Sequence, residues 1–233
     1  MMTSNAPLSA FYFSSSKFDF WPIYKSIKQY YPLGMSREGS LFFQYSGFDE
    51  LGKIIMENIH DATDFKQRWS DFENKVGLLA DKEVIGTTYG QAPSFSGYLI
   101  LDSLRLPDRT LTKELFFAVS LVSKFYTVIG RDKTQINLSE ITFAESTNLL
   151  IVSPEGIYQP FFEMVCLQIE KQFDSYRFVP YEIATQYLEG LHVRYTDEPA
   201  DKIFNALFNK QIDLDASVIG DRYCKSSSWA IQE

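Results

Sequence analysis

The sequence predicts an α+β fold, in which helices pack on one side or at the ends of an antiparallel sheet. Residues 114–132, ELFFAVSLVSKFYTVIGRD, are rich in the β-branched and aromatic residues that favour strands. Residues 49–59 and 160–171 instead place apolar side chains on helical faces. Aromatic residues make up 16% of the chain, which indicates a well-packed core. We expect a single globular domain over residues 1–233, with a weak seam at 86–97 where Gly, Pro and Ser cluster.

The first part of the chain is expected to mix short strands with helices. Strands are predicted around 11–13 (FYF) and 40–46 (SLFFQYS), and a short helix between them covers 21–31 with Pro22 in its first turn. A clearer helix begins at Asp49, which is a suitable N-cap. The apolar face of this helix is formed by Leu51, Ile54, Ile55 and Ile59.

A further helix is predicted to end at Gly77, a suitable C-terminal stop. Residues 97–106, GYLILDSLRL, are interpreted as a strand that follows this helix. The apolar residues that recur at helical spacing before Gly77 are Phe65, Trp69, Phe72 and Val76.

Residues 114–132 are interpreted as one long central strand. The odd positions are nearly all apolar and are expected in the core, whereas the even positions, with Lys124 and Tyr126, are expected at the surface. A strand of about fifteen residues is much longer than the usual five or six, so we expect a bulge near Ser123 and Lys124. The stretch is too short and too interrupted to span a bilayer.

The last part of the chain is expected to hold one strand and three helices. Residues 148–153, NLLIVS, are predicted to form the strand. A largely buried helix is predicted from Pro160, because its apolar face is wide. A second helix is predicted over 180–190, and a third begins at 196–199, TDEP, with Thr or Asp as its cap and Pro in its first turn.

The charge balance restricts the classes of partner. The chain has 22 basic and 30 acidic residues, a formal net charge of −8. We therefore expect no binding to nucleic acid or to an anionic membrane surface, since both require an excess of cations. Residues 134–201 hold 11 acids and only 3 bases. Such a segment is either a solvated acidic face or a docking surface for a basic protein.

Cysteine usage and hydropathy indicate a cytoplasmic protein. Cys166 lies in an apolar run and is expected in the core, whereas Cys224 lies in a polar segment. Two cysteines do not make a disulfide framework, so a reducing compartment fits best. The first twenty residues lack the pattern of a signal peptide. No apolar stretch approaches the roughly 18 residues that a spanning helix needs.

The sequence offers few catalytic groups, and we assign no catalytic, cofactor-binding or metal-ligating residue. His60 has carboxylates nearby but no second histidine at ligand spacing, and both His60 and His192 are expected to be structural. GQAPSFSG, at 90–97, is not a nucleophile elbow. DLDASVIGD, at 213–221, lacks the central glycine and closing glutamate of a calcium loop. The lack of these catalytic and metal-binding patterns favours a protein without catalysis and without a cofactor, but it does not exclude an enzyme.

Two passages carry a resemblance to a known class of proteins. SLVSKFYTVIGRD (120–132) and FNALFNKQIDLDASVIGDRY (204–223) resemble, in general texture, the small acidic immunity proteins of bacterial polymorphic toxin systems. The resemblance covers about the C-terminal half of the chain. It implies a cytosolic α+β protein that binds one cognate toxin domain and blocks its active site. That class is too diverse for functional residues to be carried over by position.

Three functions follow as hypotheses. The first is a non-catalytic cytoplasmic protein that binds and neutralises a basic protein partner such as a cognate toxin domain. The alternative is a small-ligand-binding protein or enzyme with a pocket lined by Tyr and Phe near GQAPSFSG, into which His60 or His192 would point. A structural subunit of a symmetric assembly is a third interpretation. The residues predicted to form the partner interface are Glu140, Glu145, Glu155, Asp197, Glu198 and Asp201.

Overall fold

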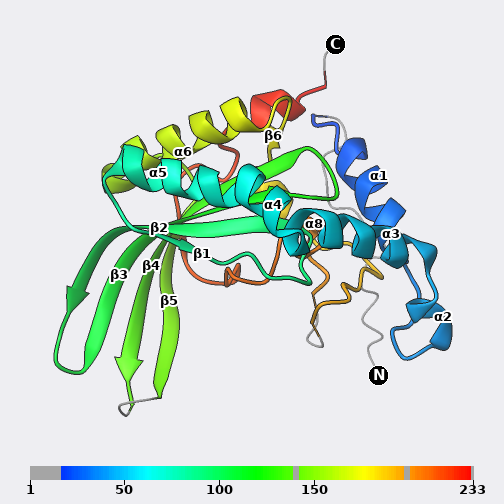
Figure 1. Cartoon of the computed structure of the whole chain (residues 1–233), viewed down its shortest axis with the longest axis horizontal. Helices are drawn as coiled ribbons and strands as arrows, with labels where there is room; N and C mark the ends of the chain where they lie inside the picture. The colour runs from blue at the N-terminus through cyan, green and yellow to red at the C-terminus, as the bar shows by residue number, and fades with distance from the viewer. Residues whose placement is uncertain (1–16, 139–141, 197–199, 232–233) are drawn as a thin grey trace, which may run out of the picture.

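The computed structural model describes residues 17–138, 142–196 and 200–231. Its centre is a seven-stranded sheet in which five strands, β1 to β5, pair in chain order and antiparallel. Two short strands add parallel pairs, β6 beside β4 and β7 beside β5 (Figure 1). The predicted α+β fold is therefore confirmed. The strands are β1 (Val84–Gly86), β2 (Ser94–Arg105), β3 (Arg109–Ser120), β4 (Phe125–Asn137), β5 (Phe143–Ile151), β6 (Arg177–Phe178) and β7 (Val218–Ile219).

The longer helices fall into two groups. α5 and α6 lie along one face of the sheet, whereas α1, α2 and α3 lie beyond one end of it (Figure 1). The helix predicted with Pro22 in its first turn is confirmed as α1, and the one predicted from Pro160 is confirmed as α6. The helices are α1 (Trp21–Tyr30), α2 (Ser40–Phe43), α3 (Ser46–Ile55), α4 (Ala62–Phe65), α5 (Asp71–Ala80), α6 (Gln159–Gln172), α7 (Tyr181–Ala184) and α8 (Ile203–Leu207).

Two buried clusters lie on opposite faces of the sheet. Successive side chains of a strand point to opposite faces, and those of β3 enter the two clusters in turn. Phe116 and Ala118 pack with residues of α1, α3 and α8. Leu115, Phe117 and Val119 pack with residues of α5 and α6. Both faces of this part of the sheet are therefore covered.

The passage 114–132 is not one strand but a hairpin, which corrects our interpretation. β3 ends at Ser120 and β4 begins at Phe125, and Val119 pairs with Tyr126 across the turn. A turn replaces the expected bulge, because the chain reverses where Ser123 and exposed Lys124 interrupt the apolar run. Most even positions are also buried rather than at the surface, and Tyr126 is fully buried, whereas Lys124 is exposed as expected. A stretch that is apolar on both faces belongs to a sheet covered on both sides.

The distal halves of β2 to β5 project from the body as an arm with both faces uncovered, seen at lower left in Figure 1. We call this arm the wing; it comprises residues 102–113, 132–138 and 142–148. Two bulges mark its base, one at Leu101 in β2 and one at Asn148 in β5. They lie at the same level of the sheet, because Asp102, Lys113, Asp132 and Leu149 are paired neighbours. A bulge bends its strand, so two at one level turn the wing away from the body.

Two predictions for the N-terminal part are wrong. Residues 40–46 do not form a strand, because Ser40–Phe43 is a helical turn that buries only Phe42 and exposes its neighbours. α3 begins at Ser46, so Asp49 lies inside the helix rather than at its N-cap. The strand predicted at 11–13 lies outside the described residues.

The predicted bounds of three helices also differ from the structure. α5 continues past Gly77 to Ala80, and it ends where Asp81 adopts the left-handed conformation with φ 50°. The helix predicted over 180–190 is a single turn, because Tyr187 instead forms a β-bridge with Lys202. The third helix starts only at Ile203, and 197–199 lie outside the described residues.

The C-terminal segment holds the N-terminal helix in place. Trp229 is 1% exposed, and its indole N–H donates to the Phe178 carbonyl at 2.7 Å. Its own carbonyl accepts from Asp19 N–H at 2.8 Å, immediately before α1. The next residue, Ala230, forms a β-bridge with Phe18. The two ends of the described chain are therefore tied to each other and to β6.

Candidate functional site

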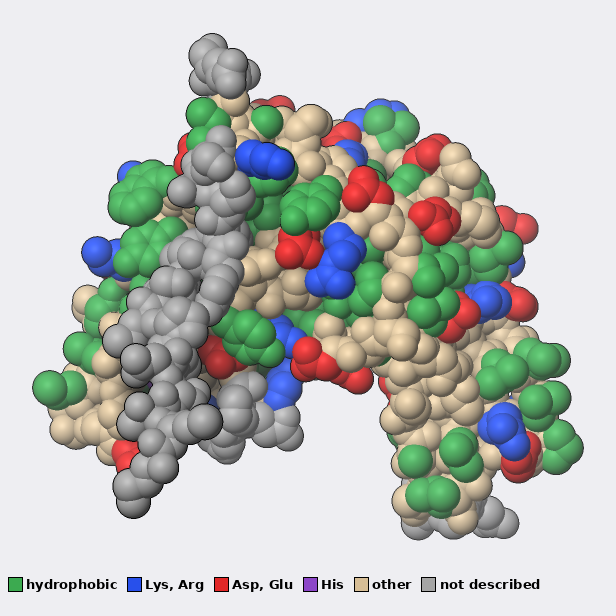
Figure 2. Space-filling model, turned by 180° about the vertical axis from the view of Figure 1, so that it is seen from behind, with side chains coloured by type: hydrophobic (Ala, Val, Ile, Leu, Met, Phe, Trp, Pro, Cys, Tyr) green, Lys and Arg blue, Asp and Glu red, His purple; other side chains and the backbone are tan. Residues whose placement is uncertain are grey.

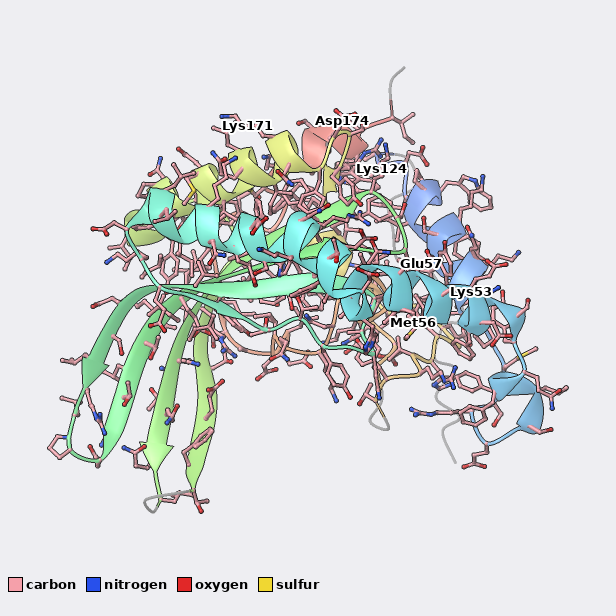
Figure 3. All side chains as sticks on the ribbon, viewed as in Figure 1. Lys53, Met56, Glu57, Lys124, Lys171 and Asp174 are labelled. Carbon is pink, nitrogen blue, oxygen red and sulfur yellow. The ribbon has the colours of Figure 1, made fainter. Side chains whose placement is uncertain are left out.

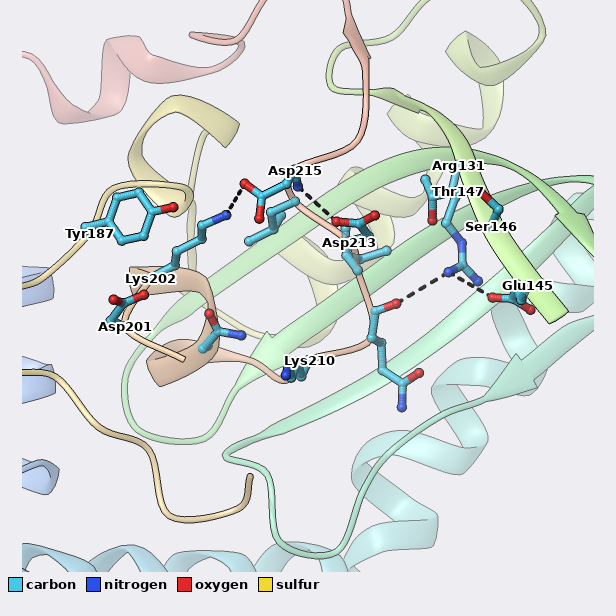
Figure 4. Close-up of a pocket in the computed structure, with 14 residues that line it drawn as sticks. Arg131, Glu145, Ser146, Thr147, Tyr187, Asp201, Lys202, Lys210, Asp213 and Asp215 are labelled. Carbon is cyan, nitrogen blue, oxygen red and sulfur yellow. Dashed lines mark hydrogen bonds and ion pairs between the residues drawn. The ribbon is translucent and has the colours of Figure 1, made fainter. Parts of the chain in front are cut away.

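A groove of about 690 Å³ opens between the base of the wing and the segment 201–215. Figure 2 shows the wing at lower right, with an open recess between it and the rest of the molecule. Residues of β4 and β5 form one wall of the groove, and Tyr187 with the segment 201–215 forms the other (Figure 4). Its volume is within the range of pockets that bind ligands or peptide segments. The groove is lined by Arg131, Glu145, Ser146, Thr147, Tyr187, Asp201, Lys202, Asn205, Lys210, Gln211, Ile212, Asp213, Leu214 and Asp215.

Acidic and basic side chains are both present in the groove, and part of the charge is already paired. Lys202 Nζ lies 2.6 Å from Asp215 Oδ1, and Arg131 Nη1 lies 3.3 Å from Glu145 Oε1 (Figure 4). Asp201 forms no ion pair with any described residue and is half-buried at the rim. Its carboxylate is therefore a group of the groove that a cation on a partner can reach.

A buried ion network holds the wing wall of the groove. Glu114, which is 1% exposed, accepts from Arg131 Nε at 2.6 Å and lies 3.2 Å from Lys133 Nζ. Arg131 also lies over the ring of Tyr98, with 4.6 Å between guanidinium carbon and ring centroid. Its Nη1 donates weakly to the Gln211 carbonyl at 3.5 Å. The network therefore joins β2, β3 and β4 to the loop on the other side of the groove.

Only part of the predicted interface comes together. Glu145 and Asp201 lie on opposite walls of the groove. Glu155 lies elsewhere, exposed before α6, where it accepts from Ser153 Oγ at 3.1 Å. The predicted residues that lie outside the described part are Glu140, Asp197 and Glu198.

Part of the acidic segment 134–201 is neutralised by bases from other parts of the chain. Glu182 Oε2 lies 2.8 Å from Arg222 Nε, and Glu170 Oε1 lies 2.6 Å from Lys225 Nζ. Glu145 is likewise paired with Lys133 at 3.1 Å. The acidic excess of residues 134–201 is therefore partly balanced in the folded protein by basic side chains from outside that segment.

Sequence reasoning missed several residues of the groove. Asp213 and Asp215 were considered only as part of a poor calcium loop, and Arg131 and Lys202 were not considered at all. Asp213 Oδ1 accepts from the backbone N–H of Asp215 at 3.1 Å, so the loop turns on its own side chains. The spacing D-x-D in DLDAS is the one signal that could have indicated such a turn.

A second, more apolar pocket of about 310 Å³ lies beside α3, and we call it the aromatic pocket. It is where the alternative function placed a pocket, since Gly90 and Gln91 of GQAPSFSG line it and His60 lies at its edge. His192 does not line it and instead lies edge-on to the ring of Phe42, at 6.2 Å between centroids. The lining consists of Tyr31, Phe48, Leu51, Gly52, Ile55, Met56, His60, Gly90, Gln91, Arg194 and Tyr195.

The two cysteines give no sign of a reactive thiol. Cys166 is buried as predicted, and burial raises the pKa of its thiol to about 12. Cys224 is half-buried, and burial together with Asp221 raises the pKa of its thiol. A thiol with a raised pKa is a poor nucleophile at neutral pH. In the described residues, no group of His, Cys, Asp or Glu side chains is arranged to hold a metal ion.

A perturbed carboxyl group lies away from both cavities, under the edge of the sheet. Burial raises the pKa of Glu73 to about 7, although the neighbouring Trp69 indole acts in the opposite direction. The carboxylate lies against Gly86 and Gly97, and a Cβ added at Gly97 would meet Glu73 Oε1 at 2.9 Å. The two glycines therefore leave room for the acid between α5 and the strands.

We expect Glu73→Gln to stabilise the protein at pH 8 and to have little effect at pH 5. Because the folded-state pKa is raised, the folded state binds the proton more tightly, and wild-type stability falls as pH rises from about 4.5 to about 7. Glutamine carries no such cost, so the gain at pH 8 should be about 1 to 2 kcal/mol after allowing for partial exposure. Urea denaturation at both pH values measures it. Equal pH dependence in the two proteins would contradict the prediction.

Comparisons with known proteins do not assign the chain to a family. No protein-family model matches it, and neither curated proteins nor solved structures gave a match. Among the described residues, no helix is both long enough and apolar enough to cross a membrane. The site must therefore be interpreted from its own geometry and chemistry.

Proposed function

We propose that this chain is a non-catalytic cytoplasmic interaction protein that binds a basic protein partner, such as a cognate toxin domain, in the groove. The observation that carries the proposal is the position of Asp201, which lies without an ion pair among the described residues in a recess between wing and body. Asp213, which is exposed, adds a second carboxylate to the same recess. Carboxylates placed in this way attract a cationic partner during encounter and orient it.

The wing supplies an apolar anchor beside these charges. Phe143 is 58% exposed and shares one face of β5 with Glu145 and Thr147, which line the groove. Its partner across β4, Asn137, is exposed and polar. A large aromatic side chain next to a charged rim is a common source of binding energy in protein interfaces. A partner segment that enters the groove would therefore contact Phe143 and the carboxylates together.

Charge reversal at the groove tests the proposal. Asp201→Lys should weaken binding to the partner on the order of tenfold, mainly through slower association, because an attraction becomes a repulsion. Phe143→Ala should weaken the same interaction by faster dissociation, since it removes an apolar anchor. The partner is recovered by affinity capture on the wild-type chain from its native host, and surface plasmon resonance then measures both rates. The captured partner should carry a net positive charge.

Glu163→Lys is the matched control for charge. Glu163 is exposed on α6, on the other face of the sheet, and the substitution changes net charge by the same amount as Asp201→Lys. It should leave the association rate nearly unchanged. The proposal is wrong if Asp201→Lys and Glu163→Lys bind the captured protein equally well, or if Phe143→Ala binds like the wild type.

A further inference from the structure

The aromatic pocket has rigid walls. The hydroxyl groups of Tyr31 and Tyr195 donate hydrogen bonds to backbone carbonyls. Tyr31 donates to that of Ala206 at 3.0 Å, and Tyr195 to that of Asn205 at 2.8 Å. Burial raises the pKa of both phenols above the ordinary value, so they remain neutral. With their hydroxyls engaged elsewhere, these residues offer ring surface to the cavity. Phe48, Leu51 and Ile55 extend the apolar wall along α3.

The ionisable side chains that line the pocket are those of Tyr31, His60, Arg194 and Tyr195. Among the residues that the structure describes, no carboxylate lines it, although the chain has 30 acidic residues. Arg194 is exposed at the mouth, and its guanidinium carbon lies 5.9 Å from the centroid of the Phe48 ring. No described residue forms an ion pair with it. His60 Nε2 donates to the Gly90 carbonyl at 2.9 Å, which fixes the imidazole at the edge of the cavity.

α3 leaves a gap that opens into the pocket. Gly52 lines the cavity from the middle of α3, and a Cβ built on it would meet no heavy atom within 4 Å. Met56, labelled in Figure 3, is 59% exposed one turn further along the same side of the helix. A glycine inside a helix is less favourable than most other residues by roughly 0.5–1 kcal/mol. Gly52 therefore keeps a cavity open at a cost in helix stability.

From these features we infer that the aromatic pocket is a binding site for a small apolar carboxylate. The carboxylate would pair with the Arg194 guanidinium at the mouth, because Arg has donors in the geometry that a carboxylate accepts. The apolar body of the ligand would lie against Tyr31, Phe48 and Ile55. The volume is near the lower end of the range for small-molecule sites, which favours a single ring or a short branched chain. Among the described residues, the pocket and the groove share no lining residue, so the inference is independent of partner binding in the groove.

Three matched fluorinated probes test the ligand class on the full chain. Ligand-observed ¹⁹F NMR is recorded with 4-fluorophenylacetate, its neutral amide and the cationic 4-fluorophenethylamine. We expect the carboxylate to bind at least about tenfold more tightly than the amide, a difference of about 1.4 kcal/mol. The amine should show no binding. The inference is overturned if the amide binds as well as the carboxylate, or if the carboxylate shows no binding up to about 5 mM.

Two substitutions place the binding in this pocket. Gly52→Leu should abolish binding of 4-fluorophenylacetate by filling the cavity, while leaving the fold at least as stable because leucine is the better helix former. Lys53→Leu is its control, since Lys53 is exposed on the adjacent helical position and lies outside the pocket (Figure 3). Arg194→Met should weaken binding about tenfold, whereas Arg105→Met on the exposed wing makes the same charge change and should not. Retained binding in Gly52→Leu, or equal loss in both arginine variants, would overturn the assignment.

Discussion

Replacing Glu114 by alanine should lower the free energy of unfolding by about 3 to 5 kcal/mol, because it removes one partner of a buried ion network. Glu114 is 1% exposed and contacts both Arg131 and Lys133. Without it, the Arg131 guanidinium stays buried over the Tyr98 ring. The remaining carboxylate nearby is Glu145, at 3.3 Å, and a third of that side chain is exposed. A buried cation without a close, buried counter-charge is costly.

Equilibrium denaturation by urea measures the effect of Glu114→Ala, and two further variants serve as comparisons. Glu145→Ala, which removes the outer acid of the same network, should cost no more than about 1 kcal/mol, since a partly exposed pair is screened by water. The double variant Glu114→Leu with Arg131→Met should recover most of the lost stability, because an apolar pair leaves no charge uncompensated. If Glu114→Ala cost no more than Glu145→Ala, the network would not stabilise the base of the wing.

Trp229→Ala is expected to destabilise the protein by about 3 to 5 kcal/mol, the range for removing a large aromatic side chain from a core. The ring of Trp229 lies 5.6 Å from that of Phe125 and 6.3 Å from that of Phe20, centroid to centroid. The Arg177 guanidinium carbon lies 4.5 Å from its ring centroid, a cation–π contact. One side chain therefore joins the β3–β4 hairpin, β6 and the segment before α1.

Thermal unfolding together with amide hydrogen exchange tests the role of Trp229. Trp229→Phe should cost much less than Trp229→Ala, since it keeps most of the apolar contact and loses chiefly the 2.7 Å hydrogen bond to Phe178, worth about 1 kcal/mol. In Trp229→Ala, α1 should lose exchange protection before the sheet does, because the indole no longer packs against Phe20, which immediately precedes α1. Unchanged protection of α1 in that variant would contradict the proposed attachment.

Local sequence determined the helices that have strong boundary signals and one dominant apolar face. α1 and α6 begin beside Pro22 and Pro160, where a fixed backbone angle suits a first helical turn. These signals act within one or two helical turns, so such a helix can be predicted without knowledge of its tertiary contacts. Where the signals were weaker, as in 40–46 and 180–190, packing against other segments decided the outcome: Phe42 packs on His192, and Tyr187 forms a β-bridge with Lys202.

Tertiary structure decided how the sheet is covered and bent. The apolar run 114–132 is compatible with one long strand or with two strands of a hairpin, because apolar residues at alternate positions are expected in both cases. The hairpin buries both of its faces because α5 and α6 cover one face, and α1, α3, α8 and the segments 188–196 and 200–214 cover the other. Local patterning does not encode this arrangement. The bulges at Leu101 and Asn148 form by pairing with other strands, and neither lies next to a glycine or a proline.

The amino-acid sequence alone determined the fold class, the net charge and the scarcity of catalytic groups, because each of these depends on composition or on local periodicity. Only the tertiary structure decided which charges remain available. Glu170 and Glu182 are paired with bases 55 and 40 residues along the chain, and Glu145 is paired with Lys133 on the neighbouring strand. Asp201 instead lies without an ion pair among the described residues at the groove. The same holds for Arg194 at the aromatic pocket. Charge pairing and cavities depend on side chains brought together across long sequence separations, so no window of the sequence could show them.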